Sequence, residues 1–399
     1  MTMKPRLLII SQHFPPDRSG NASRIYDLSR NLVKLGSDVT VLSPFPSFPH
    51  GSYRQVWRLS RSHMVEGIQQ RQLFSWQACA KDPSFFSRMG YYLLFPLHAI
   101  IWSLLLRKKY DVIITSVPPI FTGITGLFIK KMTGKKWFFD VRDLWIDASV
   151  SLGFIKKDSL FMRLSKHYEK LCYALSDGIT VTTEEVKKSI LKENTISPDK
   201  IFIIPNGVDT DVFKPSDTKH NRIIYTGNIG HAQDLSTVIL AIKKINEHMP
   251  LEFYLIGDGD IKQDLEKLVK QEHLGDTVIF TGILKRERIP QLISESMIGI
   301  APLKKLETLK YAIPTKVYEY MSCGTPFVAT GAGEIEHLAK ESGGGIIADN
   351  SVDSIYHSLL DLLHNTELIE EMKKNGRAYV KKYYDRRKIA EKLLEYIMQ

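Results

Sequence analysis

The feature that most constrains the fold of this chain is a regular alternation of short apolar segments with amphipathic ones. Residues 7–11 (LLIIS) show the pattern of a buried strand, and apolar residues then recur at helical spacing across 24–35. Residues 39–44 (VTVLSP) form the next apolar run. A buried strand, an amphipathic helix and a second buried strand make up the βαβ unit of a parallel sheet. We therefore predict an α/β fold with doubly wound sheets.

The alternation continues in two series, which indicates two domains, and 399 residues also exceed the usual size of one core. Further strands are expected near 111–116, 135–145, 178–183 and 201–205, and then near 222–227, 251–257, 277–283, 298–303, 326–330 and 344–349. The expected organisation is a first domain at 1–205, a linker at 206–220, a second domain at 221–380, and a C-terminal helix at 381–399 that packs back toward the first domain.

Charge is unevenly distributed along the chain. Residues 1–205 contain 29 basic and 16 acidic side chains, a balance of +13, whereas the other 194 residues contain 25 and 28, a balance of −3. A basic first domain predicts an anionic partner, such as anionic lipid or an acidic substrate; the alternative is a lysine-rich surface that only aids solubility. Nucleic acid is not expected, because no recognition motif accompanies the charge.

Cysteine usage and the N-terminus favour a cytoplasmic protein. The three cysteines lie far apart with no CxxC pair, so neither a disulfide framework nor a structural zinc site is expected. The apolar run at 7–10 is only four residues long, which fits a first strand and not a signal peptide.

Residues 83–110 predict a helix with an unusual surface. Eighteen residues, 89–106, carry no formal charge and lie between Arg88 and the basic triplet at 107–109. Their length would permit a membrane span, but Pro96 within them argues against one. A half-buried core helix and a helix lying on a membrane surface both remain open. The preceding residues, 45–82, are expected to form a long excursion or a β-rich insertion.

The stretch 311–336 contains the best candidate for a ligand site. A loop with Thr315 and Lys316 leads into a short helix, and a lysine at a helix N-terminus suits an anion such as a diphosphate. Glu319, one turn later, is placed to accept hydrogen bonds from a diol such as a ribose. The alternative is an ordinary helix–strand unit with an exposed glutamate.

Loops after other predicted strands lie where open α/β sheets bind ligands. In the second domain these loops are 226–234, 257–260 and 282–285. In the first domain they contain Gly20 and Asn21 after the first strand, and Asp140, Arg142 and Asp143 at the tip of the strand near 135–145. The loop after the first strand lacks the GxGxxG pattern, which disfavours a nicotinamide-dependent dehydrogenase.

The ordered motifs DVRDLW, NGVD, YTGNIGHAQDL, FYLIGDGD, VIFTG, IPTKVYEYMSCGTPFVAT and GAGEIEHL resemble those of the retaining glycosyltransferases of family four. The resemblance covers nearly the whole chain. It implies the GT-B fold, two Rossmann-like doubly wound domains facing a central cleft. Within the family, the motifs are most similar to those of enzymes that add amino sugars or deoxyamino sugars to surface polysaccharide.

The resemblance assigns donor-binding roles in the second domain. Glu319 matches the second glutamate of the family's E-x7-E motif, which holds the ribose, and Thr315 and Lys316 match positions on the diphosphate. Asn228, Gly230 and Gln233 would also lie near the phosphates, and Ile283 and Leu284 match the strip that reads the base.

Four positions depart from the family pattern. Tyr311 stands where the first glutamate of E-x7-E is expected, which leaves the donor sugar open. Asn228 and Gln233 stand where many relatives carry arginine and lysine, and Arg142 with Asp143 replaces a His-Asp pair near the sugar.

The expected reaction is transfer of a sugar, such as an N-acetylated amino sugar, from a UDP-sugar to a glycan or a polyprenyl-diphosphate-linked saccharide, with retention. Arg142, Asp143 and Lys316 are the expected catalytic residues, and neither a cofactor nor a metal ion is expected. The enzyme would sit on the inner face of the cell membrane. The alternatives are a sugar-nucleotide 2-epimerase and a non-catalytic subunit that binds glycan or lipid on the same fold.

Overall fold

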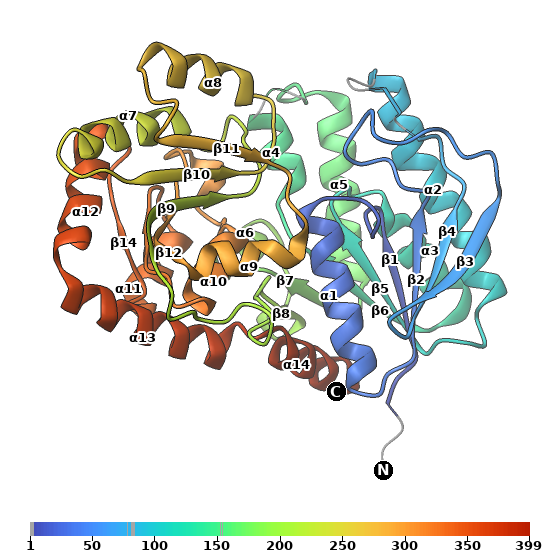
Figure 1. The fold of residues 1–399 in the computed structure, drawn as a ribbon. Helices are drawn as coiled ribbons and strands as arrows, with labels where there is room; N and C mark the ends of the chain where they lie inside the picture. Colours follow the sequence, from blue (N-terminus) through green and yellow to red (C-terminus); the bar gives the residue numbers. More distant parts are fainter. Residues whose placement is uncertain (1–3, 78, 81–83, 152, 154) are drawn as a thin grey trace. The chain divides into compact units, whose positions relative to one another are not determined.

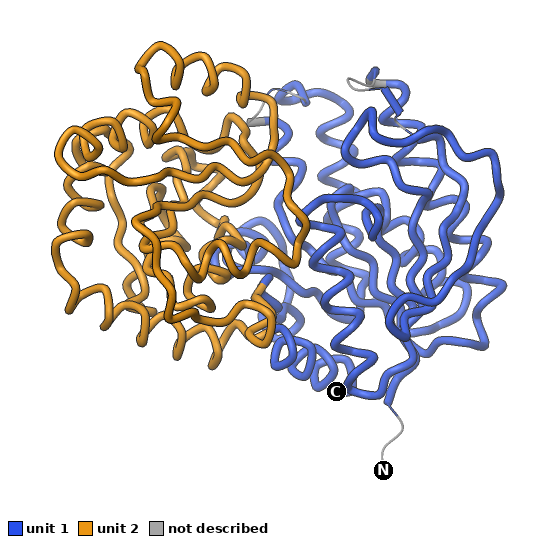
Figure 2. The backbone as a smooth tube through the Cα atoms, in the orientation of Figure 1, with its two compact units in different colours: residues 1–206, 386–399 blue, residues 207–385 orange. Residues whose placement is uncertain are grey.

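A computed structural model describes the chain except for residues 1–3, 78, 81–83, 152 and 154. The chain forms two compact units, one of residues 1–206 with 386–399 and one of residues 207–385 (Figure 2). We call them unit 1 and unit 2 and describe each by itself.

Unit 1 is built on an eight-stranded sheet with the order β3-β4-β2-β1-β5-β6-β7-β8 (Figure 1). The strands are β1 (Leu7–Ser11), β2 (Val39–Pro44), β3 (Ser60–Val65), β4 (Ile68–Leu73), β5 (Val112–Val117), β6 (Lys136–Val141), β7 (Gly178–Val181) and β8 (Ile201–Ile203). All neighbours are parallel except β3 and β4, which form an antiparallel hairpin. This hairpin lies in the segment predicted as a β-rich insertion. The strand order reverses between β1 and β5, and their carboxyl ends mark the expected ligand edge.

Helices cover both faces of this sheet. On one face, α1 (Gly20–Lys34) and α14 (Arg386–Met398) pack against β1, β2 and β5 in one apolar cluster. On the other face lie α2 (Phe85–Leu105), α3 (Thr122–Thr133) and α5 (Leu160–Leu175). The short helices α4 (Trp145–Ser151) and α6 (Glu184–Glu193) complete the unit.

Unit 2 is built on a six-stranded parallel sheet with the order β11-β10-β9-β12-β13-β14. Its strands are β9 (His220–Thr226), β10 (Glu252–Ile256), β11 (Val278–Gly282), β12 (Ser296–Ala301), β13 (Phe327–Ala329) and β14 (Gly345–Ile347). Counted within the unit, this is the order 3-2-1-4-5-6 of dinucleotide-binding domains, with its reversal between β9 and β12. The prediction of an α/β fold with two doubly wound domains is therefore confirmed.

Two apolar clusters cover the two faces of this second sheet. The first joins the sheet to α7 (Leu235–Asn246), α8 (Lys262–Gln271) and α12 (Val352–His364). The second joins it to α9 (Ile289–Ser294), α10 (Thr315–Ser322), α11 (Glu334–Ser342) and α13 (Thr366–Tyr383).

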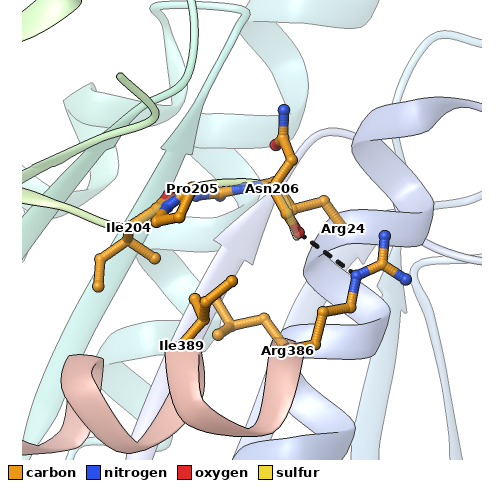
Figure 3. Close-up of a pocket in the computed structure, with 7 residues that line it drawn as sticks. Arg24, Ile204, Pro205, Asn206, Arg386 and Ile389 are labelled. Atoms are coloured by element: carbon orange, nitrogen blue, oxygen red, sulfur yellow. Dashed lines mark hydrogen bonds between the residues drawn. The ribbon is translucent and has the colours of Figure 1, made fainter. Parts of the chain in front are cut away.

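Residues 206–220, predicted as a linker, are packed where the chain passes from one unit to the other. Val208 pairs with Asp385 as an isolated bridge, and its N–H donates to the carbonyl of Tyr384 (2.9 Å). Arg386 Nε donates to the carbonyl of Asn206 (3.3 Å) beside a small pocket in unit 1 (Figure 3). The outgoing and returning segments of the chain are thus tied together, and α14 belongs to unit 1.

Candidate active site

The side chain of Lys316 lies at the carboxyl end of β9, at the point where the sheet order of unit 2 reverses. Lys316 is the second residue of α10, which begins directly after Pro314. Only 8% of the residue is exposed, and its ammonium lies 3.9 Å from the centre of the Tyr225 ring. A Cβ added at Gly227 would lie 3.4 Å from Lys316 Nζ, so the ammonium borders the first glycine of the loop after β9.

This ammonium is held in an environment that disfavours its charge. Burial lowers the pKa of Lys316 to about 7, and the nearby Glu319 carboxylate opposes only part of that shift. Among the residues that the structure describes, none forms a hydrogen bond or ion pair with Lys316 Nζ. A buried cation is stable when an anion accompanies it. The position next to a helix N-terminus and a glycine loop therefore suits a phosphate group.

The loops after β9 and β10 lie backbone against backbone. Gly227 (φ +126°) and Gly257 (φ +142°) adopt conformations that favour glycine, and a Cβ at Gly257 would lie 1.9 Å from the Gly227 carbonyl oxygen. The N–H of Ile229 donates to the carbonyl of Asp258 (2.9 Å). GDGD, by itself a weak signal in the sequence, thus supports the loop that borders Lys316.

Gln233 and Asn228 shape the same loop. Gly230 donates its N–H to the side-chain oxygen of Gln233 (3.3 Å), so this glutamine stabilises the turn before α7. Asn228 is exposed, and its side chain crowds the position that a Cβ at Gly230 would take. Neither side chain is charged, so neither supplies the positive charge that the resemblance to family four implies at these two positions.

The other predicted donor residues lie at the same sheet edge. Gly257 N–H donates to the carbonyl of Gly282 (3.1 Å), which brings the exposed Ile283 and the half-buried Leu284 next to the glycine loops. Lys304 N–H donates to the carbonyl of Ala232 (3.0 Å) and joins the loop after β12 to the loop after β9. Thr315, Tyr311 and Glu319 are half-buried in or just before α10.

Tyr320 is a positioning residue that the sequence did not reveal. Its fully buried hydroxyl accepts the N–H of Thr226 (3.1 Å) and lies 3.3 and 3.2 Å from the carbonyl oxygens of Ile224 and Ile300. One side chain of α10 therefore fixes the helix to both β9 and β12. In the sequence this tyrosine matches an ordinary apolar helix position, so its pattern carries no signal of the role.

In unit 1, Arg142 and Asp143 directly follow β6. Arg142 is buried, and its pKa is lowered to about 10, chiefly by burial and then by the charge of Arg24. Its Nε has no hydrogen-bond partner among the described residues. Gly20 and Asn21 open α1 at the same edge of the sheet, and Gly20 is exposed with open space beside it.

Asp140, grouped with Arg142 in the sequence, serves the fold. Its carboxylate is buried and accepts hydrogen bonds from Arg24 (2.9 Å), Ser116 (2.7 Å) and Thr180 (2.8 Å). These partners lie on α1, β5 and β7, so the carboxylate is saturated by its own unit. It is not available to a substrate.

A histidine–aspartate pair at the carboxyl end of β1 was also missed. His13 Nδ1 lies 2.9 Å from a carboxylate oxygen of Asp17, and the other oxygen accepts the N–H groups of Ser47 and Phe48 at 2.9 Å. Only a histidine after the first strand marks this pair in the sequence, and its partner becomes visible once the chain is folded.

A metal site is not apparent in the described part of the chain. No group of three or more histidine, cysteine, aspartate or glutamate side chains there is placed to hold an ion. The cysteines Cys79, Cys172 and Cys323 are free thiols.

Two Rossmann-like doubly wound units are the architecture of the GT-B fold. Solved structures share this fold. Anabaena HepE in complex with UDP and glucose superposes with a TM-score of 0.72 at 13% identity, over 99% of this chain and all of that one.

The family models for Glycosyltransferase Family 4 and for Glycosyl transferases group 1 match residues 18–212 and 209–379. Together these matches span both units, and the chain belongs to this family of glycosyltransferases.

Curated relatives cover most of the chain at low identity. WcaI of Escherichia coli K12, whose name describes a glycosyl transferase of colanic acid biosynthesis, is 23% identical over 82% of this chain and 83% of its own length. A phosphatidylinositol N-acetylglucosaminyltransferase subunit of Arabidopsis thaliana is 23% identical over 93% of this chain and 78% of its own.

Proposed function

We propose that this glycosyltransferase moves a sugar from a UDP-sugar to a glycan or a polyprenyl-diphosphate-linked saccharide, with retention of configuration. The observation that carries the proposal is the buried ammonium of Lys316, which forms no hydrogen bond or ion pair with the described residues and lies at the edge of a dinucleotide-type sheet. A diphosphate at this position supplies the missing anion, and Glu319 then lies one helical turn away to accept the ribose hydroxyls.

The barrier to this reaction is separation of charge. The bond between the anomeric carbon and the diphosphate breaks as negative charge gathers on the leaving oxygen. The Lys316 ammonium and the first N–H groups of α10 stabilise that charge. The acceptor oxygen then forms its bond to the anomeric carbon from the same face, and its proton passes to the departing diphosphate oxygen.

Unit 1 supplies the residues proposed for the sugar and the acceptor. The Nε of Arg142, without a partner among the described residues, is a buried donor at the carboxyl end of β6. Asp143 follows β6 directly, and Gly20 and Asn21 form the start of α1 at the same edge. Retention of configuration, and the roles proposed for these unit 1 residues, are what the resemblance of the sequence to family four implies.

The relatives support the choice of substrates. One solved neighbour holds UDP and glucose, and one curated relative is named an N-acetylglucosaminyltransferase. The name of WcaI assigns that relative to colanic acid biosynthesis. An N-acetylated amino sugar and a lipid-linked or polysaccharide acceptor at the inner membrane face are the substrates we propose for this chain.

Nucleotide binding gives the first test. UDP should raise the melting temperature more than GDP or ADP, because the proposed site binds the uracil nucleotide most tightly. A ligand that binds only the folded state adds about 2.7 kcal/mol at roughly 100 times its Kd. The measurement is a thermal-shift series with matched nucleotide concentrations. A larger shift with ADP or GDP would contradict the assignment of the uracil nucleotide.

A separate experiment distinguishes transfer from epimerisation. The protein is incubated with UDP-N-acetylglucosamine alone and followed by proton NMR. Conversion at the sugar C2 without an acceptor would identify an epimerase and overturn the proposal.

Catalysis should not depend on a divalent metal. Helix dipoles and a lysine stabilise the leaving diphosphate in the proposed site, so full activity is expected in excess EDTA. Turnover is measured before and after chelation with the same donor and acceptor. Loss of activity that Mg²⁺ or Mn²⁺ alone restores would refute this expectation.

A further inference from the structure

The outer surface of α2 is as apolar as the surface it packs against the core. Tyr91, Phe95 and Ala99 face inward and are fully buried. Two residues further along, on the opposite side of the helix, Leu97 and Ile101 are 54% and 57% exposed. A helix that serves only the core would carry polar side chains on that outer stripe.

Exposed apolar side chains also form stripes on two more helices of unit 1. On α3, Phe128 and Met132 are exposed one turn apart. On α5, the exposed apolar stripe consists of Leu160, Leu164, Leu171 and Leu175. The described residues include 22 exposed large apolar side chains, and 13 of them lie on these three helices, so the distribution is concentrated.

The three helices lie on one side of the unit 1 sheet. Thr125 of α3 donates to the carbonyl of Pro96 in α2 (2.9 Å), and a Cβ at Gly123 of α3 would touch Tyr168 and Cys172 of α5. Figure 1 shows them on the face of the sheet away from α1 and α14. We call their combined outer surface the three-helix face.

The charged side chains within the three helices are almost all basic. The sequences of α2, α3 and α5 contain a single acidic residue, Glu169, which is buried and lies 3.3 Å from Lys166. Exposed basic side chains surround the apolar stripes; they are Arg107, Lys108, Lys109, Lys131, Arg163 and Lys170. Leucine and isoleucine with lysine and arginine at the margins are typical of helices that lie in a membrane interface.

Aromatic residues extend the face beyond the start of α2. A Cβ at Gly90 of α2 would lie 3.3 Å from the Trp76 side chain, and Trp76 stands in an edge-to-face contact with Trp57 (6.3 Å between centroids). Both indoles are exposed. Tryptophan is enriched at the level of lipid headgroups, because its ring is apolar and its N–H is polar.

We propose that the three-helix face docks side-on against a leaflet that contains anionic phospholipid. None of the described helices is long and apolar enough to cross a membrane. The proposed contact lies in the membrane interface. A second copy of the chain is a poorer occupant, because two such faces would bring their basic margins together. The inference deepens the proposed function, since a lipid-linked acceptor would be met at this surface.

The test uses the full chain with vesicles of phosphatidylcholine alone or mixed with phosphatidylglycerol, separated by flotation. We expect binding to the anionic vesicles, weaker binding to the neutral ones, and release at high salt. The double variant Leu97→Glu/Ile101→Glu should lower the bound fraction at least about tenfold. Failure of the natural chain to float with either vesicle, or equal binding to both, would overturn the proposal.

A variant on α5 tests the extent of the face. Leu164→Glu should also lower the fraction of protein bound to anionic vesicles, on the order of tenfold. The matched control is Val212→Glu, which changes an exposed apolar residue of unit 2 and should leave flotation unchanged. Unchanged binding of Leu164→Glu would contradict a face of three helices.

A parallel measurement separates this test from the proposed function. UDP-induced thermal shifts are recorded for the α2 and α5 variants, and they should match the natural chain because these substitutions lie in unit 1. A chain that floats but ignores UDP would refute the donor assignment alone, whereas one that binds UDP but never floats would refute the membrane surface alone.

Discussion

Lys316→Met should reduce turnover by on the order of 10²- to 10³-fold, the loss seen when one donor to a developing anion is removed. Methionine fills a similar volume without the charge, so the Tyr225 ring keeps its neighbour while the diphosphate loses the ammonium. The UDP-induced thermal shift should fall with turnover. The measurement is initial rate with donor and acceptor, alongside the UDP shift. Near-normal turnover would remove Lys316 from the leaving-group site.

The same variant should make the ligand-free protein more stable at acid pH. The pKa of Lys316 is lowered from 10.5 to about 7 on folding, so the folded state binds its proton less tightly than the unfolded state does. The free energy of unfolding therefore rises with pH between about 7 and 10.5, and below pH 7 the penalty of burying the charge is complete. Lys316→Met removes a penalty on the order of a few kcal/mol there.

Donor binding should show the opposite dependence on pH. A bound diphosphate favours the ammonium, so UDP affinity should be highest below about pH 7 and decline as the pH rises above it. Lys316→Met should lose this decline. The matched control is Lys270→Met, an exposed lysine of α8 in the same unit, which should retain both the decline and normal turnover.

The elements of the fold were predicted well because the apolar periods in the sequence are strong and unambiguous. The strands at 7–11 and 39–44 coincide with β1 and β2. Thr315 and Lys316, predicted in the loop before the helix of the candidate site, instead form the first turn of that helix. Residues 45–82 were harder, because the β3–β4 hairpin has a polar outer strand whose pattern does not repeat at a period of two.

The candidate site was predictable as a set of loops and not as a set of contacts. Parallel strands bring their following loops to one edge, so the order of the strands alone places Lys316, the glycine loop and Ile283 together. The isolation of the Lys316 ammonium among the described residues and the triple contact of Tyr320 were not predictable, because both depend on side chains that meet across α10 and β9.

The surroundings of the charged residues Asp140 and Arg142 in unit 1 also could not be predicted from the sequence. Asp140 and Arg142 are two residues apart at a strand end, where both have the appearance of site residues. The fold sends them to different surroundings. Asp140 meets Arg24 from α1, a partner 116 residues away, whereas the Nε of Arg142 stays unpartnered among the described residues.

Asp140→Asn should destabilise unit 1 by about 3–5 kcal/mol, because it leaves the buried Arg24 guanidinium without its counter-charge. Side-chain exposure in this pair is 4% and 3%, and Asp140 also accepts the hydroxyls of Ser116 and Thr180.

The chain provides a matched control in the pair of Arg6 and Asp111, which is also charge-assisted (2.6 Å) but 40% and 44% exposed. Asp111→Asn should lower the free energy of unfolding by less than about 1 kcal/mol, because water screens that pair. Urea unfolding of the three proteins at neutral pH measures both effects. Equal losses would show that burial adds nothing to the Asp140 pair. A large loss confined to Asp140→Asn would show that this buried carboxylate stabilises the strand end that carries Arg142.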